Sequence, residues 1–164
     1  MSMRLRQLAT AFLLLLAATT VWSLGEDTHA IATAMKKQFD RPDAPLQVAP
    51  VTVEGDYAVA GWLQAGKGGR ALLQKSQGAW TIAVCAGDGL KDPKVLESTG
   101  MSSATARKLA RAVVAAESKL GVDVRTRFAS FEGIVKVDAA APHAHGAHHA
   151  APTGHHMPAK ATGH

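Results

Sequence analysis

The carboxyl-terminal stretch HAHGAHHAAPTGHHMP, residues 143–158, gathers the side chains of this chain that are best suited to bind a metal ion. Seven of the eight histidines lie between residue 143 and the last residue, and the eighth is His29. Imidazole has an unperturbed pKa near 6.5, so an exposed imidazole is mostly neutral at pH 7 and offers a nitrogen lone pair. The candidate metal ligands of this segment are His143, His145, His148, His149, His155, His156, Met157 and His164.

The donor atoms of this segment indicate which ions it would bind. Imidazole nitrogen binds divalent first-row metals most tightly at copper, and zinc and nickel also accept it. The thioether of Met157 suits Cu(I). The segment has no side-chain carboxylate, which argues against calcium, magnesium or manganese. Copper, as Cu(I) or Cu(II), is therefore the first expectation, with zinc and nickel left open.

Two other interpretations of the histidine-rich segment remain open beside metal binding. A solubilising linker would have a similarly polar composition, and a pH-sensing segment would gain charge below about pH 6.5. A purification tag fits poorly, because the histidines are interrupted by other residues. Once one histidine holds an ion, its tethered neighbours are at high local concentration, which favours the metal-binding interpretation.

Cys85 is the only cysteine, so it has no partner for a disulfide within the chain. It is either a buried, inert thiol or a soft ligand for Cu(I). Asp88 and Asp92 follow it closely, yet no histidine lies between His29 and the terminal segment to serve as the base of a nucleophile. We therefore expect a protein that is not an enzyme, with no catalytic residues.

The first 25 residues have the parts of a secretory signal peptide. Arg4 and Arg6 precede an apolar run at residues 8–21, and small residues then offer cleavage after Ser23 or Gly25. The alternative is an uncleaved anchor, but the run is short against the roughly 20 apolar residues of a membrane-spanning helix. We expect export with cleavage, and hence a periplasmic location.

The charge of the chain does not favour nucleic acid as a partner. The formal net charge is +5, and removal of Arg4 and Arg6 with the signal leaves about +3. The glycine cluster at residues 66–69 lacks the spacing of a phosphate-binding loop and indicates a turn instead.

The elements that must carry these residues follow from the apolar pattern. Apolar residues four apart at Ile31, Met35 and Phe39 predict a helix, with Asp27 or Thr28 capping its first turn. Alternating residues separated by short turns predict an antiparallel meander, and a second, longer helix follows it. The expected ranges are a helix at 26–40, strands at 46–53, 57–64, 70–76 and 80–85, a helix at 101–120 and a strand at 128–138.

Alternation predicts which side chains share a face of the sheet. Trp80, Ile82 and Val84 are expected on one face, and Cys85 on the other with Thr81. In the second helix, the stripe Ala106, Leu109, Ala110, Val113 and Leu120 is expected to face the sheet, with Ser102 or Ser103 as the N-cap.

The fold class expected is α+β: a meander of four to five strands packed by an N-terminal helix and a second long helix. The domain organisation expected is a signal peptide at 1–25, a single domain at 26–138 and a disordered tail at 139–164, because the tail lacks apolar periodicity. A helix on a curved sheet, as in cystatin-like or nuclear-transport-factor-like folds, is an alternative shape that would favour a small-ligand or interaction module.

Four segments, DRPDAPL (40–46), GDYAVAGWLQAGKGGRALLQK (55–75), WTIAVCAGDGLKDP (80–93) and FASFEG (128–133), resemble the copper uptake system-associated proteins, a family of small exported bacterial proteins. The histidine-rich end is similar too. The resemblance implies a periplasmic role in copper acquisition or handling, beside a TonB-dependent outer-membrane copper receptor or another periplasmic copper carrier. It is this resemblance, and not the spacing of the histidines, that places copper above zinc and nickel.

Overall fold

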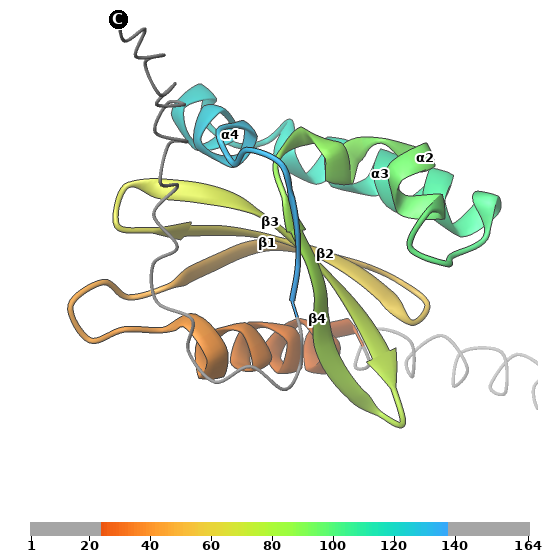
Figure 1. Ribbon diagram of the computed structural model, residues 1–164, viewed down its shortest axis with the longest axis horizontal. Coiled ribbons are helices and arrows are strands. Elements are labelled where there is room, and N and C mark those ends of the chain that lie inside the picture. The colour runs from red at the N-terminus through yellow and green to blue at the C-terminus, as the bar shows by residue number, and fades with distance from the viewer. Residues whose placement is uncertain (1–23, 138–164) are drawn as a thin grey trace, which may run out of the picture.

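The computed structural model describes residues 24–137, and these form an α+β fold built on one five-stranded antiparallel sheet. The strands follow the chain in the order β1-β2-β3-β4-β5, so the sheet is a simple meander. Helices cover both faces of the sheet, with the N-terminal helix on one side and α2, α3 and α4 on the other (Figure 1). The predicted fold class is confirmed. Except for Leu24 and Gly25, the predicted signal peptide and tail lie outside the described residues.

The bounds of the elements agree with most of the predicted ranges. The strands are β1 (Gln47–Glu54), β2 (Tyr57–Gln64), β3 (Lys67–Ser76), β4 (Ala79–Ala86) and β5 (Ile134–Lys136). The N-terminal helix covers residues 24–39. It is followed, after β4, by the 3-10 helix η1 (Asp88–Lys91) and the helices α2 (Pro93–Glu97), α3 (Ser103–Glu117) and α4 (Val122–Ala129). Within residues 24–137, no helix is both long and apolar enough to cross a membrane.

Two-residue loops join the first four strands, and this is why the hairpins could be read from the sequence. Ala65 and Gly66 both have positive φ angles, 49° and 75°, and so do Gln77 and Gly78, 50° and 81°. Two consecutive residues of this kind form the type I′ turn, whose twist matches that of the strands it joins. Of the glycine cluster at 66–69, Gly66 alone belongs to the turn, because β3 already begins at Lys67.

The sheet has an apolar core on each face. The first core joins Val59, Leu72 and Val84 to the predicted stripe of α3, of which Leu109 is fully buried. Leu120 was also predicted in this stripe, but α3 ends at Glu117 and Leu120 is not a member of the core. Ser102 caps α3, as its side chain accepts a hydrogen bond from the Thr105 backbone N–H at 3.2 Å. The second core joins the N-terminal helix to the opposite face of the sheet. Its buried members are Ile31, Met35, Leu46, Ala58, Ala60, Ala71, Leu73, Trp80, Ile82 and Cys85.

The predicted orientation of Cys85 is wrong, and a β-bulge is the reason. In the pairing of β3 with β4, Leu72 lies opposite Val84 but Leu73 lies opposite Ile82, which leaves Ala83 as an extra residue. One extra residue reverses the alternation beyond it. Val84 therefore joins the first core, whereas Cys85 joins Trp80 and Ile82 in the second.

The end of the domain also differs from the prediction. The expected strand at 128–138 is limited to Ile134–Lys136, and Phe128 belongs instead to the last turn of α4. The short helices η1 and α2 occupy the interval between the predicted strand at 80–85 and the predicted helix at 101–120, where no element was expected. Phe128 is fully buried against β2, where a Cβ at Gly61 would lie only 2.6 Å from its ring. The local pattern could not predict this helix, because α4 packs on a strand that is distant from it in the sequence.

The predicted caps of the N-terminal helix are also wrong, because Asp27 and Thr28 lie within the helix. The Asp27 carboxylate instead reaches the sheet. It accepts hydrogen bonds from Lys75 Nζ at 2.7 Å and from the Trp80 indole N–H at 2.9 Å. The helix is thereby fixed to β3 and β4 at its amino-terminal end.

Candidate functional site

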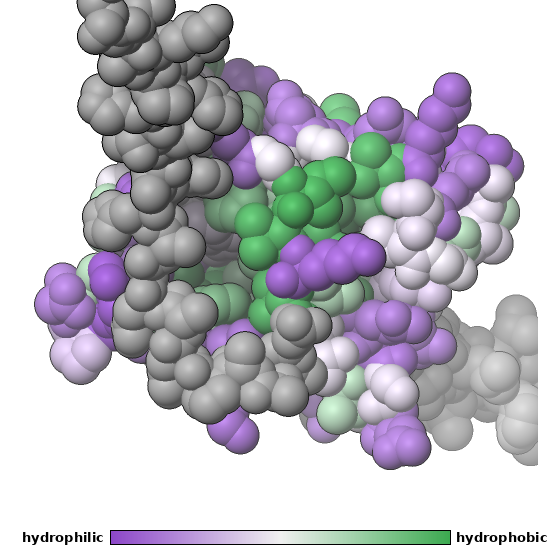
Figure 2. Space-filling view, viewed as in Figure 1, coloured by the Kyte–Doolittle hydropathy of each residue, from purple (hydrophilic) through white to green (hydrophobic). Residues whose placement is uncertain are grey.

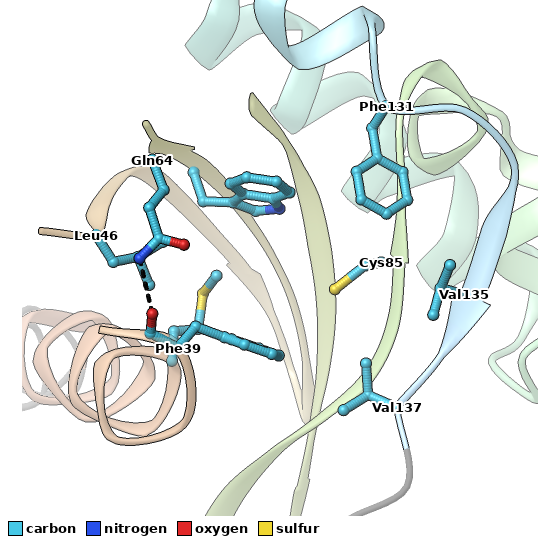
Figure 3. A pocket seen from close by; sticks show the side chains of 9 residues that line it. Phe39, Leu46, Gln64, Cys85, Phe131, Val135 and Val137 are labelled. Carbon is cyan, nitrogen blue, oxygen red and sulfur yellow. Dashed lines mark hydrogen bonds between the residues drawn. The ribbon is translucent and has the colours of Figure 1, made fainter. Parts of the chain in front are cut away.

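An apolar pocket of about 230 Å³ opens between the N-terminal helix, the sheet and the segment that contains β5. Figure 3 shows the Cys85 sulfur turned toward the middle of this pocket, with Phe39 on one side and Val135 and Val137 on the other. Three aromatic rings and two sulfur-containing side chains are among the groups that line it. The lining residues are Met35, Phe39, Leu46, Trp62, Gln64, Cys85, Phe131, Val135 and Val137.

The pocket owes its shape to two contacts at its rim. The Gln64 side-chain amide donates a hydrogen bond of 2.7 Å to the Phe39 backbone oxygen, which joins the end of β2 to the end of the N-terminal helix (Figure 3). It donates a second, of 2.9 Å, to the Ala44 backbone oxygen in the segment that follows the helix. Trp62 meets Phe131 edge to face, with 5.8 Å between ring centroids and an interplanar angle of 83°. Such edge-to-face pairs are a favoured aromatic geometry. The pocket is therefore held by side chains from β2 and from the segment after α4.

Cys85 is buried, and burial raises the pKa of its thiol to about 11. At neutral pH the group is a thiol, whereas the nucleophile and the strong metal ligand is the thiolate. The two aspartates that follow it have other roles. Asp88 binds Arg70 and Lys91, and Asp92 caps α2 by accepting a hydrogen bond from the Lys94 backbone N–H at 2.8 Å. Cys85 thus shares the pocket lining with the Met35 thioether, and none of the residues that line the pocket is a base.

Of the predicted metal ligands, Cys85 is the one that lies within the described residues. Cys85 lies in the pocket, His29 is exposed on the N-terminal helix, and the histidines from 143 onward and Met157 lie outside the described residues. In the part of the chain from residue 24 to residue 137, no three histidine, cysteine, aspartate or glutamate side chains come together as a metal site would require.

A buried charged cluster on the other face of the sheet was not anticipated from the sequence. Arg70 on β3 is fully buried, and its guanidinium donates two hydrogen bonds to the Glu117 carboxylate, both at 2.6 Å. It also donates to Asp88 at 3.1 Å and to the Phe128 backbone oxygen at 3.3 Å. The Phe128 ring lies 5.5 Å from the guanidinium carbon.

This cluster joins β3, α3, η1 and α4 through one side chain. Lys91 contacts Asp88 at 2.7 Å, and this hydrogen bond, with the nearby charges of Lys91 and Arg70, keeps the pKa of the Asp88 carboxyl below its usual value. A buried guanidinium with its donors used by carboxylates and a carbonyl is a structural group. One signal for it was present in the sequence, because Glu117 continues the apolar stripe of α3 four residues after Val113.

Comparisons with known proteins add no family to this description. The chain matches no protein-family model, no curated protein and no solved structure.

Proposed function

We propose that the protein binds copper in the periplasm and assists its uptake or handling, with residues 139–164 capturing the ion and passing it on. The observation that carries the proposal is the concentration of seven imidazoles and one thioether within residues 143–164. Imidazole ligands on one short segment bind copper more tightly than the other first-row divalent metals. The resemblance to copper uptake system-associated proteins supports copper over zinc and nickel.

The arrangement of the chain is consistent with this division of roles. The described members of both apolar cores lie within residues 31–137, and the histidines begin at residue 143, after β5. A folded domain followed by a ligand-rich terminus would dock to a partner through its surface while the terminus exchanges the ion. A TonB-dependent outer-membrane copper receptor or another periplasmic copper carrier is the partner we propose.

The test is a titration of the exported chain with Cu(II), and with Cu(I) under reducing conditions, followed by competition with zinc and nickel. Replacing the seven histidines from 143 onward with glutamine is expected to abolish Cu(II) binding, because an amide is a poor substitute for imidazole. His29→Gln is the matched control and is expected to leave stoichiometry and affinity unchanged. Equal binding by the seven-histidine variant would refute the proposal.

Cu(I) tests the role of the two sulfur-containing groups separately. We propose Met157 as the main sulfur ligand of Cu(I) and Cys85 as a minor one, since the Cys85 thiol is buried and holds its proton at neutral pH. Met157→Leu is then expected to weaken Cu(I) binding, and Cys85→Ser to change it little. If Cys85→Ser weakens Cu(I) binding more than Met157→Leu does, the Cu(I) site lies instead in the pocket that Cys85 and Met35 line.

A second candidate function, a small-ligand module, is favoured by the apolar pocket. A cavity of about 230 Å³ lined almost wholly by apolar side chains suits a small apolar molecule. Trp62 lines the pocket, so binding of such a molecule is expected to change its fluorescence. Cys85→Phe would fill the space and remove the response, whereas a response that survives this change would place the ligand elsewhere.

A further inference from the structure

The apolar pocket holds one group that a purely apolar ligand would leave unused, the side-chain oxygen of Gln64. Gln64 is the one lining residue whose side chain carries an oxygen. Trp62 contributes an indole N–H, and the remaining lining side chains are hydrocarbon or sulfur-containing. The direction in which the Gln64 oxygen points therefore bears on which small molecules the pocket suits.

Two hydrogen bonds fix the orientation of the Gln64 amide. Its nitrogen donates to the backbone oxygens of Phe39 at 2.7 Å and of Ala44 at 2.9 Å. A flipped amide would set the Gln64 oxygen against these two carbonyl oxygens, so the oxygen must lie on the opposite side. Figure 3 shows it turned toward the part of the pocket where Cys85 and Phe131 lie.

The Gln64 oxygen is free to accept a further hydrogen bond. Within residues 24–137, the two hydrogen bonds of the Gln64 side chain both use its nitrogen. The oxygen is also open to solvent, because Arg41 Nε is the one fully buried side-chain nitrogen or oxygen without a partner in that part of the chain. An amide oxygen can only accept, so a ligand must supply the donor. An occupant without a donor would leave this oxygen desolvated and unpaired.

The rest of the lining disfavours a charged ligand. None of the lining residues carries a charge at neutral pH, since burial raises the pKa of the Cys85 thiol to about 11. An ammonium or carboxylate group would lose hydration in the pocket without gaining an opposite charge. A neutral hydroxyl can donate one hydrogen bond at a much smaller cost of desolvation.

The aromatic and sulfur-containing groups suit a ring as the body of the ligand. Trp62 and Phe131 meet edge to face, and Gly69 makes room for both, since a Cβ there would lie 2.8 Å from Trp62 Cζ2. The sulfurs of Met35 and Cys85 favour contact with the edge of an aromatic ring. The volume of about 230 Å³ exceeds the roughly 150 Å³ of a cavity that holds benzene, which leaves space for a substituent.

The pocket reaches the surface of the described domain beside β5. Val135 lines the pocket and is 50 % exposed. In Figure 1, β5 (blue) lies at the front of the sheet, and Figure 2 shows apolar surface gathered in the same part of the view. Among the described residues, a small molecule thus has an apolar approach to the pocket.

We propose that the pocket binds a small phenol, a single aromatic ring whose hydroxyl donates a hydrogen bond to the Gln64 oxygen. The ring lies among Phe39, Trp62 and Phe131, and the hydroxyl faces the end of β2. A phenol hydroxyl has a pKa of about 10 and is therefore neutral at pH 7. This assignment rests on the second candidate function, the small-ligand module, and names the chemical class of its ligand.

The experiment is calorimetric titration of the exported chain with 4-ethylphenol and with 4-ethyltoluene, in which a methyl group replaces the hydroxyl. Both probes are titrated into the wild type, into Gln64→Met and into the matched control Gln74→Met, whose glutamine is exposed on β3. Because the probes differ in hydrophobicity, the quantity compared is the ratio of their dissociation constants. Gln64→Met is expected to shift this ratio about fivefold against the phenol, the contribution of one hydrogen bond. Gln74→Met is expected to leave it unchanged.

A third probe tests the wild type alone, so that the result does not depend on the folding of Gln64→Met. The methyl ether 4-ethylanisole keeps the oxygen of the phenol but has no hydrogen to donate. It is expected to bind about fivefold more weakly than 4-ethylphenol, because its oxygen would face the Gln64 oxygen without a hydrogen bond. Equal or tighter binding of the ether overturns the phenol assignment.

The other outcomes separate this assignment from the small-ligand function itself. Cys85→Phe, which fills the pocket, is expected to remove the binding of every probe. A ratio that is the same in the wild type and in a folded Gln64→Met overturns the phenol assignment alone, because the pocket then binds a ring without using the Gln64 oxygen. Binding of no probe to the wild type overturns the assignment and the small-ligand function together.

Discussion

At the scale of single residues, the buried ion pair of the described domain is that of Arg70 with Glu117. The Arg70 guanidinium and the Glu117 carboxylate are both buried, and they form two parallel hydrogen bonds of 2.6 Å. Removal of one partner from such a pair leaves an uncompensated buried charge, which is more costly than removal of both. Arg70 thus stabilises the contact between β3 and α3 only while Glu117 is present.

Arg70→Met and Glu117→Leu are each expected to lower the free energy of unfolding by about 3–5 kcal/mol. The double variant is expected to lose less than either single variant, because no buried charge then remains unpaired between these two positions. Urea unfolding followed by circular dichroism measures all three.

The matched control is Lys108→Met, which breaks the exposed pair of Lys108 with Glu54 at 3.3 Å. Exposed pairs contribute about 0–1 kcal/mol, so little change is expected. Additive losses in the double variant R70M/E117L would contradict the coupling inferred here.

At the scale of elements, the N-terminal helix is fixed to the sheet by both its apolar face and one carboxylate. Ile31 and Met35 are buried in the second core, and Asp27 binds Lys75 and Trp80 at the amino-terminal end of the helix. The same helix supplies one wall of the pocket. The position of this helix therefore determines whether the pocket exists.

Asp27→Asn is expected to lower the free energy of unfolding at pH 7 by about 1 kcal/mol, through the loss of one charge-assisted hydrogen bond. The hydrogen bond from Lys75, then that from Trp80, hold the pKa of the Asp27 carboxyl below its usual value. Because the folded-state pKa is the lower one, this stabilisation is present at neutral pH and is lost as the pH falls below about 4.

Urea unfolding of the wild type and of Asp27→Asn at several pH values measures this difference. The free energies of unfolding of the two proteins are expected to become equal at acid pH. Asp43→Asn serves as the control, because Asp43 is exposed and its contact with Arg41 is 3.9 Å long. A difference between wild type and Asp27→Asn that persists unchanged at acid pH would show that the carboxylate charge has no part in fixing the helix.

At the scale of the whole molecule, the described core contacts all come from residues that precede the histidine-rich segment. Both cores and the Arg70 cluster are built from residues 31–137. Stability and metal binding are therefore expected to reside in different parts of the chain.

Truncation after Asp138 tests this separation. The free energy of unfolding is expected to change by less than about 0.5 kcal/mol, as for surface changes away from packed features. The same protein is expected to lose Cu(II) binding. Thermal unfolding and a copper titration on one preparation measure both, and a large loss of stability would mean that residues 139–164 pack on the domain.

The sequence by itself determined the local features of this protein. Short turns and alternating residues sufficed for the four-strand meander, and Ser102 or Ser103 for the start of α3, because these signals come from residues close together in the chain. The candidate metal ligands beyond residue 138 were likewise identified from residue type and spacing alone, and they stay a prediction.

Only the tertiary structure decided the features that join distant residues. Ala83 forms a bulge because of how β3 and β4 pair, and this bulge turns Cys85 into the pocket. Arg70 and Glu117 are 47 positions apart, and the pocket joins side chains from residue 35 to residue 137. Packing across such separations depends on the fit of whole elements, whereas periodicity and turn chemistry report only on neighbouring residues.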